Sequence, residues 1–122
     1  MADFQGLLVW QEAHELVLEV YRATRGFPAS EQFQLTRQLC KSAASIPANL
    51  AEGMGKNGNR ERARYTKIAL GSSSEVRYHL LLARDLGFLD PVRYNDLTLK
   101  AERVGRMLQA LYRTLRKKGA IR

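Results

Sequence analysis

The spacing of apolar residues near the carboxyl end of the chain is the strongest constraint on the fold. Between residues 97 and 115 they recur at intervals of four, three, four, three and four residues: Leu97, Ala101, Val104, Leu108, Leu111 and Leu115. Residues three or four apart share one face of an α-helix, whereas the side chains of a strand alternate between two faces. We therefore expect an amphipathic helix whose apolar stripe packs against other helices, as in a coiled coil.

Three other segments show helical spacing, and turn-forming residues separate all four. The predicted helices cover about residues 8–25, 31–54, 60–86 and 91–117. Helices of this length joined by short loops predict an all-α fold, an antiparallel up-down four-helix bundle. Residues 1–122 are expected to form this bundle as a single domain.

Capping residues suggest where these helices begin and end. Ser30 is the expected N-cap of the second helix and Asn59 that of the third. Gly119 is expected to end the fourth helix and to leave a short basic tail. The apolar stripe of the first helix is predicted at Trp10, Ala13, Val17, Val20, Tyr21 and Thr24.

The chain is basic, and its charge is unevenly distributed. It carries 20 Lys and Arg against 12 Asp and Glu, which gives a net charge of +8 and an isoelectric point near 10.1. Residues 60–122 hold 15 of the basic and six of the acidic side chains, so residues 1–59 are close to neutral. This asymmetry favours contact with a polyanion such as nucleic acid over the alternative of a merely solvated surface.

The remaining composition suggests a cytoplasmic protein without disulfides. Cys40 is the single cysteine, so no internal disulfide can form, as is usual in a reducing compartment. No apolar run approaches the roughly 20 residues of a membrane helix. The amino terminus lacks the basic start and the apolar stretch of a signal peptide, so we expect a cytoplasmic location.

The stretch GMGKNG at residues 53–58 matches the G-x-G-x-x-G pattern of dinucleotide-binding loops. That pattern binds dinucleotides between a strand and a helix, whereas here a helix precedes it. A P-loop would need glycine at position 50 and serine or threonine at position 57, where the chain has Leu50 and Asn57. We therefore expect a helix end and a turn in which several glycines adopt positive φ.

Pro47 lies inside the second predicted helix, among small residues. It removes the backbone hydrogen bond to the carbonyl of Ala43 and bends the helix axis, and the small neighbours let the bent helix approach another closely. The alternative is a true break, in which Ser45 caps a new helix that begins at Pro47. We favour the bend.

The sequence shows no arrangement typical of an enzyme or of a metal site. Cys40 has no C-x-x-C partner, and His14 and His79 lie on different predicted helices. Glu52 and Glu75 form either a carboxylate pair across two helices or, as we prefer, ion pairs with nearby arginines. We expect no catalytic activity, no metal and no cofactor.

The most specific segments are SIPANLAEG at 45–53 and G-S-x-x-E at 71–75. Together with VWQEAHELVLEVY at 9–21 and FPASEQFQLTRQL at 27–39, they resemble the four-helix proteins encoded within intervening sequences of bacterial 23S ribosomal RNA genes. Eight residues match the family pattern by position and are expected to be architectural: Ser45, Pro47, Asn49, Glu52, Gly53, Gly71, Ser72 and Glu75.

This resemblance implies an up-down four-helix bundle that assembles as a homopentameric ring, with no catalytic residues. The chain is also similar to the accessory variability proteins of diversity-generating retroelements, which are basic pentameric bundles that bind nucleic acid and a reverse transcriptase. That similarity implies an alternative function, a protein-interaction adaptor such as a partner of a reverse transcriptase.

The leading functional hypothesis is non-catalytic binding of RNA or DNA through phosphate contacts. Such contacts depend on cations and carry no sequence information. Few aromatic residues lie near the relevant cations along the chain, so base stacking is expected to be minor. The candidate residues lie around the start of the third helix and the end of the fourth: Lys56, Arg60, Arg62, Arg64, Lys67, Arg113, Arg116, Lys117, Lys118 and Arg122.

Overall fold

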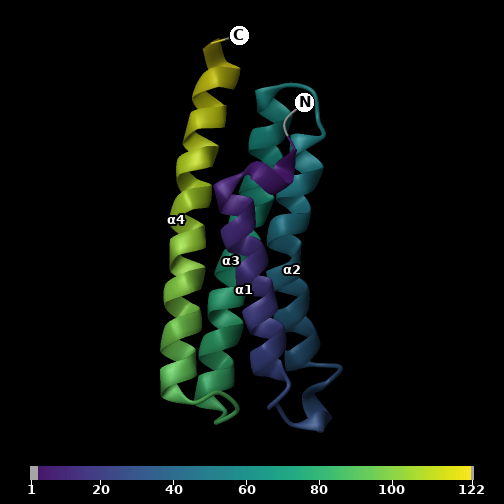
Figure 1. The fold of residues 1–122 in the computed structure, drawn as a ribbon, viewed down its shortest axis with the longest axis vertical. Coiled ribbons are helices and arrows are strands. Elements are labelled where there is room, and N and C mark those ends of the chain that lie inside the picture. Colours follow the sequence, from purple (N-terminus) through teal and green to yellow (C-terminus); the bar gives the residue numbers. More distant parts are fainter. Residues whose placement is uncertain (1–2, 122) are drawn as a thin grey trace.

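The computed structural model describes the backbone of residues 3–121 and the side chains of residues 3–119, and it is helical with no strand over this range. Two short 3-10 turns, η1 (Phe4–Gly6) and η2 (Ala29–Glu31), precede the first two long helices. The long helices run alternately up and down along one axis (Figure 1): α1 (Leu8–Thr24), α2 (Leu35–Met54), α3 (Asn59–Asp85) and α4 (Pro91–Ile121). The predicted antiparallel four-helix bundle is confirmed.

One apolar core runs between the four helices. In α4 the predicted stripe is confirmed, because five of its six residues are buried and Leu111 is half-buried. Each large aliphatic side chain that leaves water contributes about 1.5–3 kcal/mol, so this core is the main source of stability. None of the described helices is long and apolar enough to span a bilayer.

The buried face of α1 differs from the predicted one. Leu16 is fully buried, whereas Tyr21 is 49% exposed and Trp10 and Val17 are only half-buried. Apolar residues occupy two adjacent faces of this helix, so periodicity alone does not decide which of them faces the core. Trp10 packs partly against the core and partly against Phe4 of η1, with ring centroids 5.1 Å apart.

Two predicted N-caps are wrong. Ser30 lies within η2, and α2 begins only at Leu35, whose backbone N–H donates to the Glu31 carboxylate at 3.4 Å. Gly58, with φ of 90°, is the N-cap of α3, and Asn59 is the first residue of that helix. The η2 turn delays α2 beyond Ser30, whereas α3 begins one residue earlier than predicted, at Asn59 itself.

Glycines have three different roles in this fold, and only two have positive φ among the described residues. Gly87 (φ 81°) ends α3 in a Schellman motif, in which the Phe88 N–H donates to the Ala83 carbonyl at 2.9 Å. In the GMGKNG stretch only Gly58 has positive φ, so the prediction of several such glycines is wrong. Gly53 still belongs to α2.

The end of α4 also differs from the prediction, because the helix passes through Gly119 and continues to Ile121. Here α4 runs beside the first turn of α3, and a Cβ at Gly119 would lie 3.5 Å from the backbone nitrogen of Arg60. Lys117 and Lys118 therefore belong to the helix and not to a tail, while Arg122 lies outside the described residues.

Helices α2 and α3 pack closely through small and polar residues. The helix α2 is unbroken at Pro47, so no new helix starts there. Ser45 does not cap a helix, since its Oγ bonds the Ser72 Oγ at 2.8 Å across the two helices and accepts from Asn49 Nδ2 at 2.9 Å. At one end of this contact, a Cβ at Gly53 would lie 2.8 Å from the Tyr65 Cβ. Gly53 thus allows an approach that no other residue permits.

The Gly53→Ala substitution is expected to lower the free energy of unfolding by about 1–2 kcal/mol, because the added methyl group overlaps a Tyr65 atom fixed to the backbone of α3. Urea denaturation followed by circular dichroism measures this change. Gly71→Ala is the matched control, since Gly71 is also helical but has nothing within 4 Å of an added Cβ. Equal stability changes in the two variants would contradict the close contact.

Candidate nucleic-acid interface

The start of α3 and the end of α4 lie at the same end of the bundle (Figure 1). Side chains of these two segments line a cleft there. Helix α1 has 17 residues, whereas α3 has 27 and α4 has 31. At a rise of about 1.5 Å per residue, α1 cannot cover the other two over their full length. The cleft between these longer helices has a volume of about 620 Å³.

Cations dominate the lining of this cleft. Arg60, Arg64 and Lys67 follow the i, i+4, i+7 spacing on one face of α3, and α4 contributes Arg116 from the facing side. Among the described lining residues, Glu61 is the one acidic side chain. A concave surface lined by one sign of charge concentrates the potential and attracts anions.

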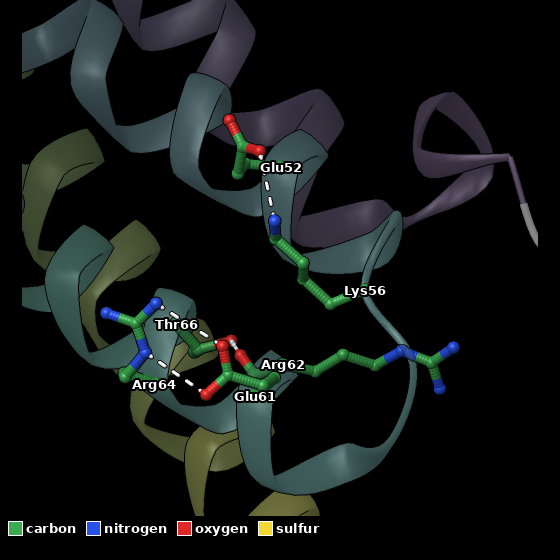
Figure 2. A network of polar contacts seen from close by, with 6 residues as sticks. All are labelled: Glu52, Lys56, Glu61, Arg62, Arg64 and Thr66. Carbon is green, nitrogen blue, oxygen red and sulfur yellow. Dashed lines mark hydrogen bonds and ion pairs between the residues drawn. The ribbon is translucent and has the colours of Figure 1, made fainter.

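One of the four cations is already paired. The Arg64 Nε and Nη2 atoms donate to the Glu61 carboxylate at 3.2 and 3.3 Å (Figure 2), and this hydrogen bonding raises the pKa of Arg64. Within the described part of the chain, Arg60, Lys67 and Arg116 form no ion pair with an acidic residue. These three are therefore the cations most available to a bound anion.

A tyrosine lies among these cations. The Arg116 Nη1 atom donates to the Tyr112 hydroxyl at 3.1 Å, and this hydrogen bond lowers the pKa of Tyr112. The Lys67 Nζ lies 6.0 Å and the Arg116 Cζ 5.8 Å from the centroid of the Tyr112 ring, which are cation–π distances. The i, i+4 spacing of Tyr112 and Arg116 predicts their contact from the sequence. The contact of Tyr112 with Lys67 cannot be predicted in this way, because Lys67 lies on another helix.

A second tyrosine has similar neighbours. Tyr65 lies with its ring centroid 5.5 Å from the Lys56 Nζ and 4.7 Å from the Arg64 Cζ. The expectation that aromatic residues are scarce near the cations is therefore wrong. The fold interleaves cations and tyrosines across the α2–α3 turn, α3 and α4, although they are scattered along the chain.

Not all the predicted candidates reach the cleft. Lys56 forms an i, i+4 ion pair with Glu52 at 3.6 Å (Figure 2). Arg62 points away from Glu61 and Arg64 toward the α2–α3 turn (Figure 2). Its Nη1 donates to the Asn59 Oδ1 at 3.3 Å. Three further candidates are exposed on α4 outside the cleft lining: Arg113, Lys117 and Lys118.

The eight residues expected to be architectural fall into two groups. Ser45, Asn49, Gly53 and Ser72 take part in the α2–α3 contact described above, and Pro47 is buried inside α2. By contrast, the exposed Glu52 pairs with Lys56 and not with an arginine, while Gly71 and Glu75 are exposed on α3. The three exposed residues leave part of the motif without a packing role inside one copy of the chain.

The histidines and the cysteine serve in packing. The His14 ring stacks on Trp10 with centroids 5.0 Å apart. The half-buried His79 has its Nδ1 atom 3.3 Å from the Ser42 Oγ, and burial lowers the pKa of this imidazole. Cys40 is buried. Among the side chains that the structure describes, no three His, Cys, Asp or Glu residues come together as a metal site requires.

Comparisons with known proteins agree with the fold. The family model of 23S rRNA-intervening sequence proteins matches residues 5–110. A solved structure of a protein with unknown function from the S23 ribosomal protein family of Bacteroides thetaiotaomicron VPI-5482 superposes with a TM-score of 0.81 and 18% identity, over 87% of this chain and 96% of that chain. At this identity the likeness shows the fold alone. A comparison with curated proteins gives no significant match.

The Arg116→Met substitution is expected to raise the pKa of Tyr112 toward its ordinary value of 10.0, because the hydrogen bond that favours the phenolate is lost. An ultraviolet pH titration of tyrosinate measures this change, and a Tyr112→Phe variant identifies which transition belongs to Tyr112. Arg113→Met is the matched control, since it removes an exposed arginine from the same helix without touching this phenol. An unchanged Tyr112 pKa in the Arg116 variant would contradict the described geometry.

Proposed function

Because the chain belongs to the family of 23S rRNA-intervening sequence proteins, we propose that it is a non-catalytic protein that binds RNA or DNA through phosphate contacts at the α3–α4 cleft. The observation that carries this proposal is the convergence of Arg60, Lys67 and Arg116 on one cleft, although they come from two helices.

The chemistry of the cleft suits a phosphate backbone. Guanidinium groups form paired hydrogen bonds with phosphate oxygens, and the lysine supplies a mobile positive charge. The first turn of α3 adds a partial positive charge, since its N-cap Gly58 provides no side-chain acceptor. None of these groups is placed to distinguish bases, so the expected binding is salt-sensitive and tolerant of sequence.

The proposed assembly is a homo-oligomer, and the family resemblance implies that it is a pentamer. Support comes from the outward face of α3, where Ile68 is 41% and Tyr78 is 59% exposed beside the open Gly71. A ring of identical subunits would repeat the cleft around one axis. Several weak phosphate contacts on one nucleic acid would then act together and raise the overall affinity.

The second candidate function is a protein-interaction adaptor, for example for a reverse transcriptase. It is favoured by a hollow between α2 and α3 at the end of the bundle opposite the cleft, which is lined by both apolar and polar side chains and where Phe33 is 76% and Leu86 is 51% exposed. The gene neighbourhood separates the two functions. A reverse transcriptase gene with template repeats supports the adaptor, whereas a position inside a 23S rRNA gene supports the RNA-binding role.

Light scattering coupled to size-exclusion chromatography is expected to give a mass several times 13.9 kDa for the protein in solution. The measurement should be repeated over a range of protein concentrations, because an assembly held by weak contacts dissociates on dilution. A monomer at every concentration would contradict the proposed ring and would leave the phosphate contacts of the single subunit to be tested separately.

A triple variant that replaces Arg60, Lys67 and Arg116 by glutamine is expected to weaken RNA binding at least tenfold at low salt. The slope of log affinity against log salt should fall by about 2, because three phosphate contacts are lost. Fluorescence anisotropy with a labelled RNA at several salt concentrations measures both quantities.

The matched control for this experiment replaces Arg22, Arg25 and Arg93, which are exposed outside the cleft, by glutamine. It removes the same net charge and is expected to change the affinity far less than the cleft variant does. Equal losses in the two triple variants would mean that total charge, and not the cleft, determines binding. Wild-type binding that does not respond to salt would overturn the phosphate-contact function itself.

A further inference from the structure

We propose that the α3–α4 groove takes a single-stranded segment of nucleic acid and that one base of this segment stacks on Tyr112. This inference rests on the proposed binding of nucleic acid at the cleft, and it adds which form of nucleic acid is preferred and which residue recognises that form.

The cleft is one part of a longer groove. A second hollow of about 430 Å³ lies farther along the same helix pair, lined by Arg77 of α3 and by Arg106 and Gln109 of α4. Glu102 of α4 also lines it and accepts from the Arg77 Nη2 at 3.3 Å, so Arg77 is already paired there. On each helix, the residues that line the two hollows follow one another at spacings of three or four, so they lie on one face of that helix. From Arg60 to Arg77 the groove follows α3 for about 26 Å, at about 1.5 Å per residue. A backbone lying along it would meet Arg60, Lys67 and Arg116 at the cleft and Arg106 at the second hollow.

Tyr112 is held in a position suited to stacking. Its hydroxyl accepts the hydrogen bond from Arg116, and its ring lines the cleft beside Lys67. The Lys67 ammonium group lies 6.0 Å from the ring centroid at the end of a flexible side chain. A base can therefore take its place on the ring while the ammonium group moves to a neighbouring phosphate. An aromatic ring flanked by cations is the usual platform on which single-stranded binding proteins hold a base.

A duplex cannot make the same contact. Packed helices lie about 8–10 Å apart, so a groove between two of them is narrow and admits a single strand more readily than a double helix. The bases of a duplex are also stacked on one another and paired, and the major groove of an RNA duplex is too deep and narrow for side chains to enter. A duplex would therefore reach only the cations at the rim of the groove, through its phosphates.

The test compares a labelled uridine-rich RNA with the duplex formed by that RNA and its complement, using fluorescence anisotropy at low and moderate salt. The Tyr112→Ala substitution should weaken single-strand binding about fivefold or more and leave duplex binding nearly unchanged. Tyr112→Phe keeps the ring and should bind the single strand almost as the wild type does. Tyr21→Ala, at an exposed tyrosine of α1 that does not line the groove, is the matched control.

A second measurement uses the wild-type protein, so it does not depend on how well a variant folds. The NMR signals of the Tyr112 ring protons should move upfield when the single strand is added, because a stacked base shields them. Equal losses for single strand and duplex in Tyr112→Ala, or ring signals that do not move on binding, would overturn this inference while the phosphate contacts stand. If neither the single strand nor the duplex binds in a salt-sensitive way, the proposed function itself is overturned.

Discussion

The unequal lengths of the helices are the constraint on which the rest of this structure depends. Four helices must bury one apolar core, but α1 has 17 residues and α4 has 31. Two ion pairs, Arg103 with Glu12 and Lys100 with Glu19, join α4 to α1 along the part of its length that α1 covers. Beyond that part, α4 continues beside the start of α3, and the cleft between them opens to solvent.

Close packing on the other side of α3 determines what surrounds this open end. Gly53 lets α2 approach α3 so closely that a Cβ at position 53 would lie 2.8 Å from the Tyr65 Cβ. Tyr65 is thereby fixed between Lys56 and Arg64, each of which also has an acidic partner one helical turn away. Residues that pack α2 against α3 therefore lie next to residues that face the cleft, on the same turns of α3.

Local patterns predict the elements of this fold better than they predict its contacts. The four helices follow from apolar spacing, since the burial that creates the pattern also stabilises the helix. The end of α4 does not, because Gly119 is a stop signal in isolation and a helical residue when packed beside Arg60. For the site, four candidate cations could be named from charge alone. The pairing of Tyr112 with Lys67 could not, because it depends on how two distant segments meet.

Because the cation-lined cleft lies at one end, the charge of the molecule is unevenly distributed along its long axis. The candidate cations gather where α3 begins and α4 ends, whereas the opposite end carries both signs of charge, with Arg84 and Asp85 paired at 3.0 Å. A polyanion would turn such a molecule during diffusion, before any contact forms. The bundle would then approach the nucleic acid with its cleft end first, and the faces away from the α3–α4 groove would stay free for other copies or other proteins.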